Sequence, residues 1–424
     1  MTSPELDRIN SLSPGATLGG FRLPEDLAFV VERGEGPTIW STDGRQFVDY
    51  VLGSGPLVLG HAHPRIVAAI QAQAARGTTY YYLNEPALKL ADRIMRLVPC
   101  AEAVKFCSSG TEATFYALRI ARAATGRDTI LKFAGGYHGS HDYGLQTLEG
   151  SRQVSESLGI PAGVTDSVVV APFNDLAATA ALADAHRERL AAIIVEPVQR
   201  AIPPSSGFLE GLREICDRTG ALLVFDEVVT GFRLALGGAQ EVYRVTPDLA
   251  ALAKAMGGGL PLAAVAGRRE LIELTVPRSE RNERAVYMGN TLNGNPLSCA
   301  AGLAALDVLE EEGGPAKIAA AGAALASGFR EAAARLDVPF QVLGPPAFGE
   351  PILGTGEIRN QDDYLRQDRA ASAAFGVELL RRGIFVNPGF KMYVSTAHGP
   401  AEIDQTVEVA EEALRAVRDQ GLVG

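Results

Sequence analysis

Short apolar runs alternate with helical patterns through the middle of the chain. The runs have the length of strands and are almost continuously apolar, as in strands that are buried on both faces. These predicted strands are Ala103–Phe106, Thr129–Phe133, Ser167–Val170, Ala191–Val195, Ala221–Phe225 and Ala263–Ala266. Amphipathic patterns such as Thr111–Ala124 and Gly207–Arg218 stand between many of them. The alternation predicts an α/β fold whose mainly parallel sheet is covered by helices on both faces.

The pattern differs at the two ends of the chain. Alternating apolar residues flank a Thr-Asp-Gly turn in residues 38–51, which predicts a β-hairpin. After Pro296 the sequence predicts helices at Leu297–Glu312, Ala316–Leu336, Asp363–Arg382 and Ala401–Asp419, and strands at Ile384–Asn387 and Met392–Ser395. We therefore predict an N-terminal segment with the hairpin (1–60) that packs with the small domain, a large domain (61–300) and a small C-terminal α+β domain (301–424).

Composition narrows the class of protein. The net charge of −11 argues against a nucleic-acid partner. No apolar run approaches the roughly 20 residues that span a bilayer, so no membrane contact is expected. The four cysteines lack CxxC spacing, which argues against a disulfide framework and a zinc site. The first residues are acidic and lack the apolar core of a signal peptide, so we expect a cytoplasmic protein.

Two dense motifs follow neighbouring predicted strands. Asp226 closes the strand Ala221–Phe225, and Lys254 stands between a strand-like run and the glycines 257–259. Such a lysine and carboxylate suit pyridoxal phosphate: the amine forms a Schiff base with the aldehyde, and the carboxylate holds the pyridine nitrogen protonated. The alternatives are a solvated lysine and an ion pair between Asp226 and Arg233.

Two turns could hold the rest of such a cofactor. The segment Cys107–Ala113 is a small, hydroxyl-bearing turn before a helix, where backbone N–H groups and the helix dipole favour a phosphate. Its alternative is a plain capping box of Ser109 and Glu112. Tyr137, in a glycine-rich turn after a strand, has an aromatic ring that could stack on a planar cofactor or simply cover the core.

Histidines and a further carboxylate complete the candidate residues. His61 and His63, like His138 and His141, lack the cysteines or carboxylates that would complete a metal site, so we expect structural roles and no metal. Glu196 closes a predicted strand, where open α/β sheets bind their ligands, although it could also be a solvated loop carboxylate.

These motifs resemble those of the class III (subgroup II) pyridoxal-phosphate-dependent aminotransferases, and most closely those of the glutamate-1-semialdehyde 2,1-aminomutase group. The resemblance covers residues 36–410 and includes segments 59–64, 109–114, 136–139, 207–213, 226–233, 246–259 and 291–296. It implies fold type I, with a three-layer α/β/α large domain of mainly parallel sheet and a smaller α+β domain.

The resemblance also implies roles for single residues. Lys254 forms the Schiff base and then acts as the acid and base of the proton shift, while Asp226 pairs with the pyridine nitrogen. The implied cofactor-binding residues are Ser109, Gly110, Thr111, Tyr137, Asp226, Val228, Lys254 and Thr291. Thr291 contacts the phosphate of the neighbouring subunit in the family, which implies a homodimer with shared active sites.

Some positions depart from the aminomutase pattern. An arginine that binds the substrate carboxylate in that group is missing from residues 10–21, and Ser54 replaces a tryptophan. Lys391 stands where the group has glutamate, and residues 199–201 read Gln-Arg-Ala in place of Ala-Gly-Asn. Arg200 or Lys391 would bind a carboxylate instead, unless both are solvated surface charges.

These departures set the predicted reaction. We predict an aminotransferase that moves an amino group between an amine or amino acid and a keto acid, aldehyde or ketone. The alternatives are the aminomutase, which gives 5-aminolevulinate, and a non-catalytic protein that binds the cofactor.

Overall fold

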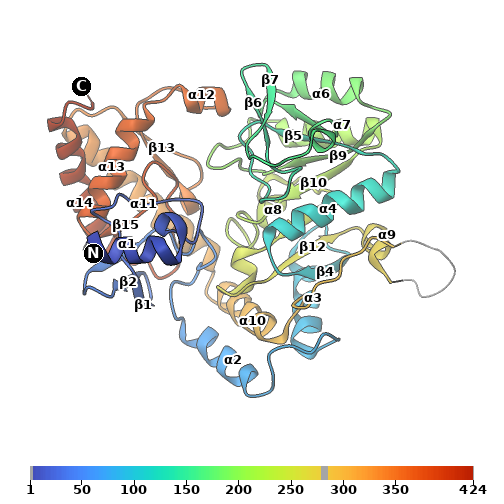
Figure 1. Cartoon of the computed structure of the whole chain (residues 1–424), viewed down its shortest axis with the longest axis horizontal. Helices are drawn as coiled ribbons and strands as arrows, with labels where there is room; N and C mark the ends of the chain where they lie inside the picture. The colour runs from blue at the N-terminus through green and yellow to red at the C-terminus, as the bar shows by residue number, and fades with distance from the viewer. Residues whose placement is uncertain (1–2, 278–284, 424) are drawn as a thin grey trace.

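The computed structural model describes residues 3–277 and 285–423. Its elements form two groups, one around a large sheet and the other around the carboxy-terminal helices (Figure 1). Both ends of the described chain lie in the second group. The division follows the change in hydrophobic pattern along the sequence.

The large sheet has seven strands in the order β4-β12-β11-β10-β9-β5-β8. They are β4 Ala103–Cys107, β5 Thr129–Phe133, β8 Val168–Ala171, β9 Leu190–Val195, β10 Leu222–Asp226, β11 Leu249–Leu252 and β12 Ala263–Gly267. All neighbours pair in parallel except β12, which is antiparallel to both β11 and β4. The predicted mainly parallel sheet is confirmed.

Helices cover both faces of this sheet. The covering helices are α4 Gly110–Thr125 on one face, and α6 Leu176–Ala185 and α7 Phe208–Thr219 on the other. Because side chains alternate along a strand, Val224 of β10 packs with α4, whereas Leu223 and Phe225 pack with α7. The same alternation directs Asp226, at the end of β10, towards the face of α4.

The second group joins the two ends of the sequence. It contains β1 Val31–Glu35, β2 Thr38–Ser41, β3 Gln46–Asp49, β13 Phe340–Leu343, β14 Glu350–Leu353, β15 Ile384–Phe385, α11 Gly314–Arg335, α13 Arg369–Arg381 and α14 Pro400–Asp419. Strands β2 and β3 form the predicted hairpin, and β3 pairs in parallel with β15. This pairing supports an N-terminal segment that packs with the small domain, while the boundaries at residues 60 and 300 stay a prediction.

The other elements complete the chain. They are α1 Ser3–Leu12, α2 Pro64–Ala74, α3 Glu85–Leu97, α5 Ala162–Thr165, α8 Gly238–Tyr243, α9 Arg269–Ile272, α10 Pro296–Glu311, α12 Gln361–Leu365, β6 Gln146–Glu149 and β7 Arg152–Ser155. Short 3₁₀ helices include η2 Lys254–Gly257. Within the described ranges, no helix is both long and apolar enough to cross a membrane.

Two predicted elements are wrong. The single helix predicted at Asp363–Arg382 is broken between α12 and α13, because the Asp368 side chain accepts the backbone N–H of Ala371 and starts a new helix. The strand predicted at Met392–Ser395 does not form. Its backbone N–H groups donate in turn to Gly349, Tyr50 and Ala347, so that no continuous ladder arises.

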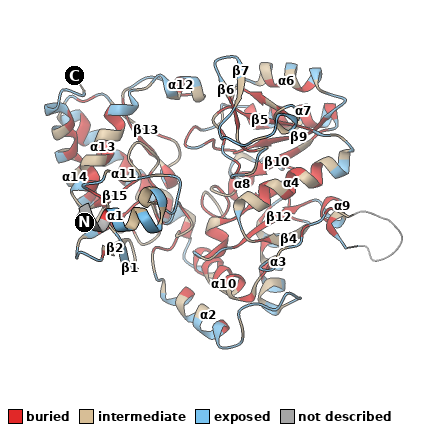
Figure 2. Ribbon diagram, in the orientation of Figure 1, coloured by how far each residue is buried: buried red, intermediate tan, exposed pale blue. Residues whose placement is uncertain are grey.

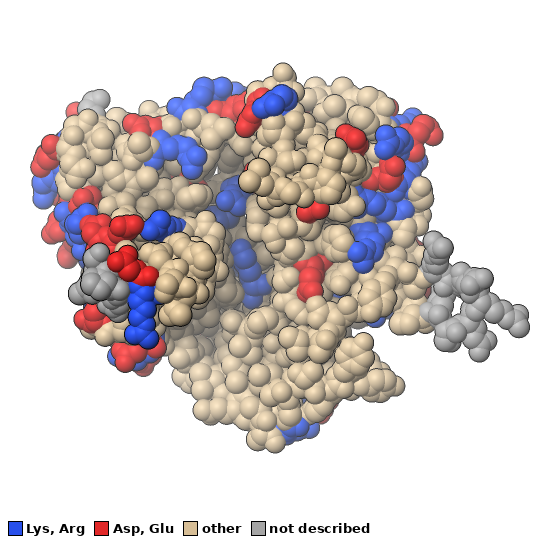
Figure 3. Space-filling view, viewed as in Figure 1, with Lys and Arg blue, Asp and Glu red and all other residues tan. Residues whose placement is uncertain are grey.

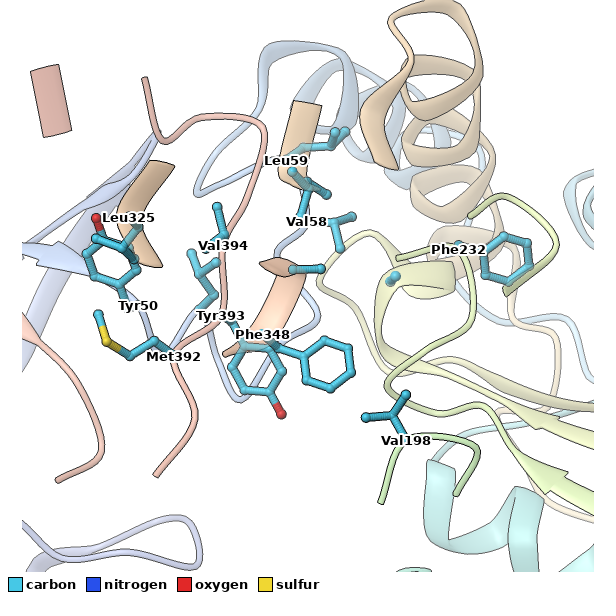
Figure 4. Packing of buried hydrophobic residues seen from close by; sticks show 14 of the residues in the cluster. Tyr50, Val58, Leu59, Val198, Phe232, Leu325, Phe348, Met392, Tyr393 and Val394 are labelled. Carbon is cyan, nitrogen blue, oxygen red and sulfur yellow. The ribbon is translucent and has the colours of Figure 1, made fainter. Parts of the chain in front are cut away.

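The interior is continuous between the two groups. Buried residues lie along the strands and on the inward faces of the helices (Figure 2). One cluster joins Tyr50 and Val58 of the N-terminal segment, Phe232 after β10, and Phe348 and Tyr393 of the carboxy-terminal part (Figure 4). The two groups therefore share apolar contacts beside the strand ends where ligands bind.

Candidate active site

A pocket of about 390 Å³ lies between the two groups, beside the carboxyl ends of β9 and β10. Figure 3 shows a hollow at this place, with basic side chains inside it. Its lining includes Ser54, Ser108, Ser109, Gly110, Thr111, Tyr137, His138, Glu196, Arg200, Asp226, Val228, Lys254, Phe390, Lys391 and Tyr393. Except for Thr291, every residue predicted from the sequence to hold cofactor or substrate lies here.

Lys254 stands at the first position of η2, directly after β11 and Ala253. Its φ is +47°, a left-handed conformation that is uncommon outside glycine. The turn can be this tight because Gly258 follows it: a Cβ on Gly258 would stand 2.7 Å from the carbonyl oxygen of Ala301 in α10. Burial lowers the pKa of Lys254, and the nearby Lys391 and Arg233 lower it further. The lysine is therefore held in a buried, shaped turn.

Asp226 is a buried carboxylate that ends β10. Its Oδ1 accepts the backbone N–H of Val228 at 3.1 Å, and its Oδ2 lies 2.8 Å from Nδ1 of His138. Burial raises the pKa of Asp226 to about 7 and lowers that of His138 to about 3, so the imidazole is neutral. The neutral ring donates its Nδ1–H to the carboxylate. The expected alternative, an ion pair with Arg233, is absent: Arg233 donates to the carbonyls of Gly55 and Val394.

At the N-terminus of α4, some backbone N–H groups are capped by side chains and others have no partner. Ser109 Oγ accepts the N–H of Glu112, and Glu112 accepts the N–H groups of Ser108 and Ser109, so the capping box is present. Within the described residues, the N–H groups of Gly110 and Thr111 have no hydrogen-bond partner. The buried Oγ of Ser108 has none either. These three donors suit a phosphate.

Tyr137 and Val228 lie on the walls of the pocket. The backbone N–H of Tyr137 donates to Oε1 of Glu196 at 2.8 Å, so Glu196 fixes the aromatic turn. Val228 packs close to Gly110, where a Cβ would approach both Val228 methyls at 3.1 Å. Glu196 is thus more than a solvated loop residue, and the absence of a side chain at Gly110 keeps the helix N-terminus near Val228.

We call Lys254, Asp226 and the turn 108–111 the floor of the pocket, and Ser54, Arg200 and Lys391 its rim. Ser54 and Arg200 are exposed. Lys391 Nζ donates to the carbonyl of Arg200 at 2.7 Å, and burial lowers the pKa of Lys391 to about 8. Lys391 is therefore not an ordinary solvated charge, whereas Arg200 is exposed.

Thr291 does not line this pocket. It is exposed in the loop before α10, where Asn290 donates its side-chain N–H to Glu112. Its predicted contact with the phosphate of a neighbouring subunit stays a prediction.

Sequence reasoning missed parts of the site. It gave His138 a structural role, whereas His138 contacts Asp226. It also assigned no role to Ser108 and did not single out Tyr393, whose ring centroid lies 5.9 Å from Lys254 Nζ. Tyr393 stands in a run with the composition of a strand, which gives no sign of a place in the pocket. Of these residues, only Ser108 could have been found from the sequence, because it stands beside Ser109 in the predicted phosphate-binding turn.

The residues present fit pyridoxal phosphate. The buried carboxylate of Asp226 is hydrogen-bonded by the Val228 N–H and a neutral imidazole, and among the described residues no Lys or Arg forms an ion pair with it, so a pyridinium would supply a cationic partner. The unpaired donors at the start of α4 match a phosphate, and Lys254 is the one amine on the floor of this pocket. Groups of His, Cys, Asp or Glu that could hold a metal are absent from the described ranges.

Comparisons with known proteins agree with this geometry. The model of the aminotransferase class-III family matches residues 23–352. A glutamate-1-semialdehyde 2,1-aminomutase from Methanothermobacter thermautotrophicus is 42% identical and covers 99% of this chain and all of its own length. An omega-transaminase from Sphaerobacter thermophilus superposes with a TM-score of 0.91 at 33% identity, covering 98% of each chain. A transaminase with pyridoxal phosphate bound gives 0.88 at 28% identity over 99% of each chain. The chain therefore belongs to the class III aminotransferases of fold type I, and its cofactor is pyridoxal phosphate.

Proposed function

We propose that the protein is an intermolecular aminotransferase that moves an amino group between an amine or amino acid and a keto acid, aldehyde or ketone. The supporting observation is the floor of the pocket, where Lys254, Asp226 and the open N-terminus of α4 meet. Amino transfer needs an amine that moves protons, a fixed charge at the cofactor ring and an anchor for the phosphate. The floor offers all three.

Each floor residue has a separate task. When bound, pyridoxal phosphate supplies a conjugated ring that withdraws electrons from the substrate carbon that loses its proton. Asp226 would hold the pyridine nitrogen protonated, and His138 orients this carboxylate. The backbone N–H groups of Gly110 and Thr111 and the hydroxyl of Ser108 would hold the phosphate.

Lys254 moves the proton of the reaction. With the cofactor bound, its Nζ would be the base that accepts the proton of the substrate Cα and the acid that gives it back. Burial lowers the pKa of this amine, so that a larger share of it is a free base near neutral pH. Tyr137 and Val228, which line the pocket, would cover the bound ring.

The choice of reaction depends on the rim. A small Ser54, a missing arginine in residues 10–21 and Lys391 in place of the family glutamate all differ from the aminomutase pattern. The name of the Methanothermobacter relative favours the second candidate, an aminomutase, better than it favours intermolecular transfer. We retain intermolecular transfer because those departures concern residues at the substrate pocket.

Product analysis separates the two reactions. We expect purified enzyme to transfer an amino group from an added amine or amino acid to an added keto acid, and to form little 5-aminolevulinate from glutamate-1-semialdehyde. Efficient 5-aminolevulinate formation without an acceptor would establish the aminomutase instead. An unchanged cofactor absorbance after amine addition, across a broad donor set, would favour the non-catalytic alternative.

We also propose a homodimer with shared active sites. Several large apolar side chains are exposed in neighbouring loops, among them Tyr81, Tyr82 and Leu83 with 71–80% exposure and Tyr287 with 73%. Asn84 ties these loops together by donating to the carbonyl of Gly294 at 2.9 Å. Thr291 lies in the second loop, which supports its predicted reach to the neighbour's phosphate. A cytoplasmic location remains part of this proposal.

A further inference from the structure

Arg200 has a backbone conformation that its residue type disfavours. Its φ is +61°, in the left-handed region where glycine is favoured. The backbone is fixed on both sides, because its N–H donates to Oε2 of Glu196 at 3.3 Å and its carbonyl accepts Lys391 Nζ at 2.7 Å. Arg200 lies in a tight turn that the backbone hydrogen bonds between Gln199 and Ile202 close, where glycine would fit without strain, so the presence of an arginine motivates a functional role for its side chain.

Arg200 borders two cavities. It lines the main pocket and a second cavity of about 270 Å³, which also borders Tyr137, Glu350 and Tyr364. Its guanidinium carbon lies 5.7 Å from the centre of the Tyr137 ring. Within the described ranges no carboxylate forms an ion pair with it, whereas Glu350 is engaged by the Tyr364 hydroxyl. The guanidinium is therefore free to bind an anion beside the cofactor-binding wall.

We infer that Arg200 binds the carboxylate of the substrate, and that amino acids and oxo acids are preferred over simple amines, aldehydes and ketones. This inference rests on the proposed function and narrows its substrate class. A planar guanidinium can hold a carboxylate with two parallel hydrogen bonds. The departure at residues 199–201 thus supplies the cation that the N-terminal segment lacks.

Lys391 is a positioning residue in this arrangement. Its ammonium group donates to the Arg200 carbonyl and lies 5.6 Å from the Tyr393 ring centroid and 5.1 Å from that of Phe348. The ammonium is thus held at the peptide of Arg200. Its effect on carboxylate binding should pass through Arg200.

The first test compares valerate with its neutral amide, pentanamide, as ligands of the holoenzyme, measured by calorimetry and by the cofactor absorbance. We expect at least about 10-fold tighter binding of valerate, since a hydrogen bond to a charged group gives roughly 10- to 150-fold. Arg200→Gly should abolish this preference, and its thermal midpoint should not fall, because glycine relieves the left-handed backbone. Arg359→Gln, which removes an equal charge outside both cavities, should keep the preference.

The roles of Arg200 and Lys391 are tested by different outcomes. An equal preference in wild type and Arg200→Gly, or none in wild type, overturns the assignment of Arg200. Lys391→Met should weaken valerate binding only while Arg200 is present; an additive effect in the double variant would show that Lys391 contacts the carboxylate itself. This binding test does not depend on turnover, so a lack of transamination would refute the proposed reaction without deciding the role of Arg200.

Discussion

The floor and the rim of the pocket are built in different ways. The floor stands on the ends of buried strands, where Asp226 closes β10 and Lys254 follows β11. The rim consists of loop residues, and two of them, Ser54 and Arg200, have positive φ angles of 69° and 61°. The floor carries the motifs of the family, whereas the rim carries most of the departures from it.

This contrast explains how one fold serves different substrates. Strand ends of a covered sheet are fixed by packing on both faces, so a lysine and a carboxylate there keep their geometry. Loops tolerate replacement at low cost, so pocket shape and charge change there first. We therefore expect changes to the floor to remove catalysis and changes to the rim to redistribute substrates.

The largest effect is expected from Lys254→Ala. It removes the amine that moves the proton, and loss of general acid–base catalysis alone costs about 10²–10⁴-fold in rate. Turnover should fall to background when followed with a responsive donor and acceptor. Lys89→Ala, at an exposed ion pair on α3, serves as the control and should match wild type. Near-normal turnover in Lys254→Ala would refute the assigned floor.

Asp226→Asn should lose most activity while retaining some cofactor. A neutral amide cannot hold a pyridinium proton, although it keeps the size of the side chain. His138→Asn should cost less, because it removes only the group that orients Asp226 at 2.8 Å. Single-turnover rates and cofactor titration would measure both. A rate within twofold of wild type for Asp226→Asn would mean that Asp226 is structural.

The floor was also the part that the sequence predicts best. Strand ends can be located from apolar runs, and a charged residue directly after such a run lies at the sheet edge, as Asp226 and Glu196 do. The capping box of Ser109 and Glu112 likewise follows from local spacing alone. The large sheet was predictable for the same reason, since most of its strands are nearly continuous apolar runs, and β5, β9, β11 and β12 are buried throughout.

The rest depends on contacts between distant segments. The hydrogen bond from His138 to Asp226 joins residues 88 positions apart, and no local pattern reveals it. The position of Lys391 at the Arg200 carbonyl joins residues 191 apart. Met392–Ser395 has the composition of a strand, yet its N–H groups donate to separate partners. The pattern of apolar residues cannot distinguish a strand that pairs with one neighbour from an extended segment that bonds to several.

The charge on the floor predicts a pH effect on the cofactor-free enzyme. Burial raises the pKa of Asp226 from 3.8 to about 7. A raised folded-state pKa stabilises the protein below pH 4, and this contribution is lost as the pH rises to about 7. The free energy of unfolding of cofactor-free wild type, relative to that of cofactor-free Asp226→Asn, should therefore fall by at most about 4 kcal/mol between pH 4 and 7. Thermal midpoints of both proteins measured across this pH range would show the fall.

Cofactor addition should reduce this slope. The pyridinium would offset the cost of the buried carboxylate. The stability of the holoenzyme should therefore fall less between pH 4 and 7 than that of the cofactor-free form. A difference between wild type and Asp226→Asn that is flat with pH would contradict a raised pKa of Asp226 in the cofactor-free enzyme.

Thr291→Ala tests whether the floor is completed by a second subunit. We expect cofactor affinity to fall by about 1.5–3 kcal/mol, the value of a hydrogen bond to a charged group. Equilibrium dialysis of the cofactor, together with sedimentation, would measure it. Thr165→Ala, a change of the same kind distant from the pocket, should have no effect on affinity. A fully active monomer would exclude shared sites.

The smallest and most selective effect is expected from Ser54→Trp at the rim. An indole ring at this position narrows the pocket, so bulky donors should lose kcat/KM while small donors change little. The left-handed backbone of residue 54 disfavours any side chain, and Ser54→Ala keeps that strain without the ring. A donor series measured on both variants separates the two causes. If Ser54→Trp slows small and bulky donors equally, then Ser54 does not set donor size, and the division of labour between floor and rim fails at this residue.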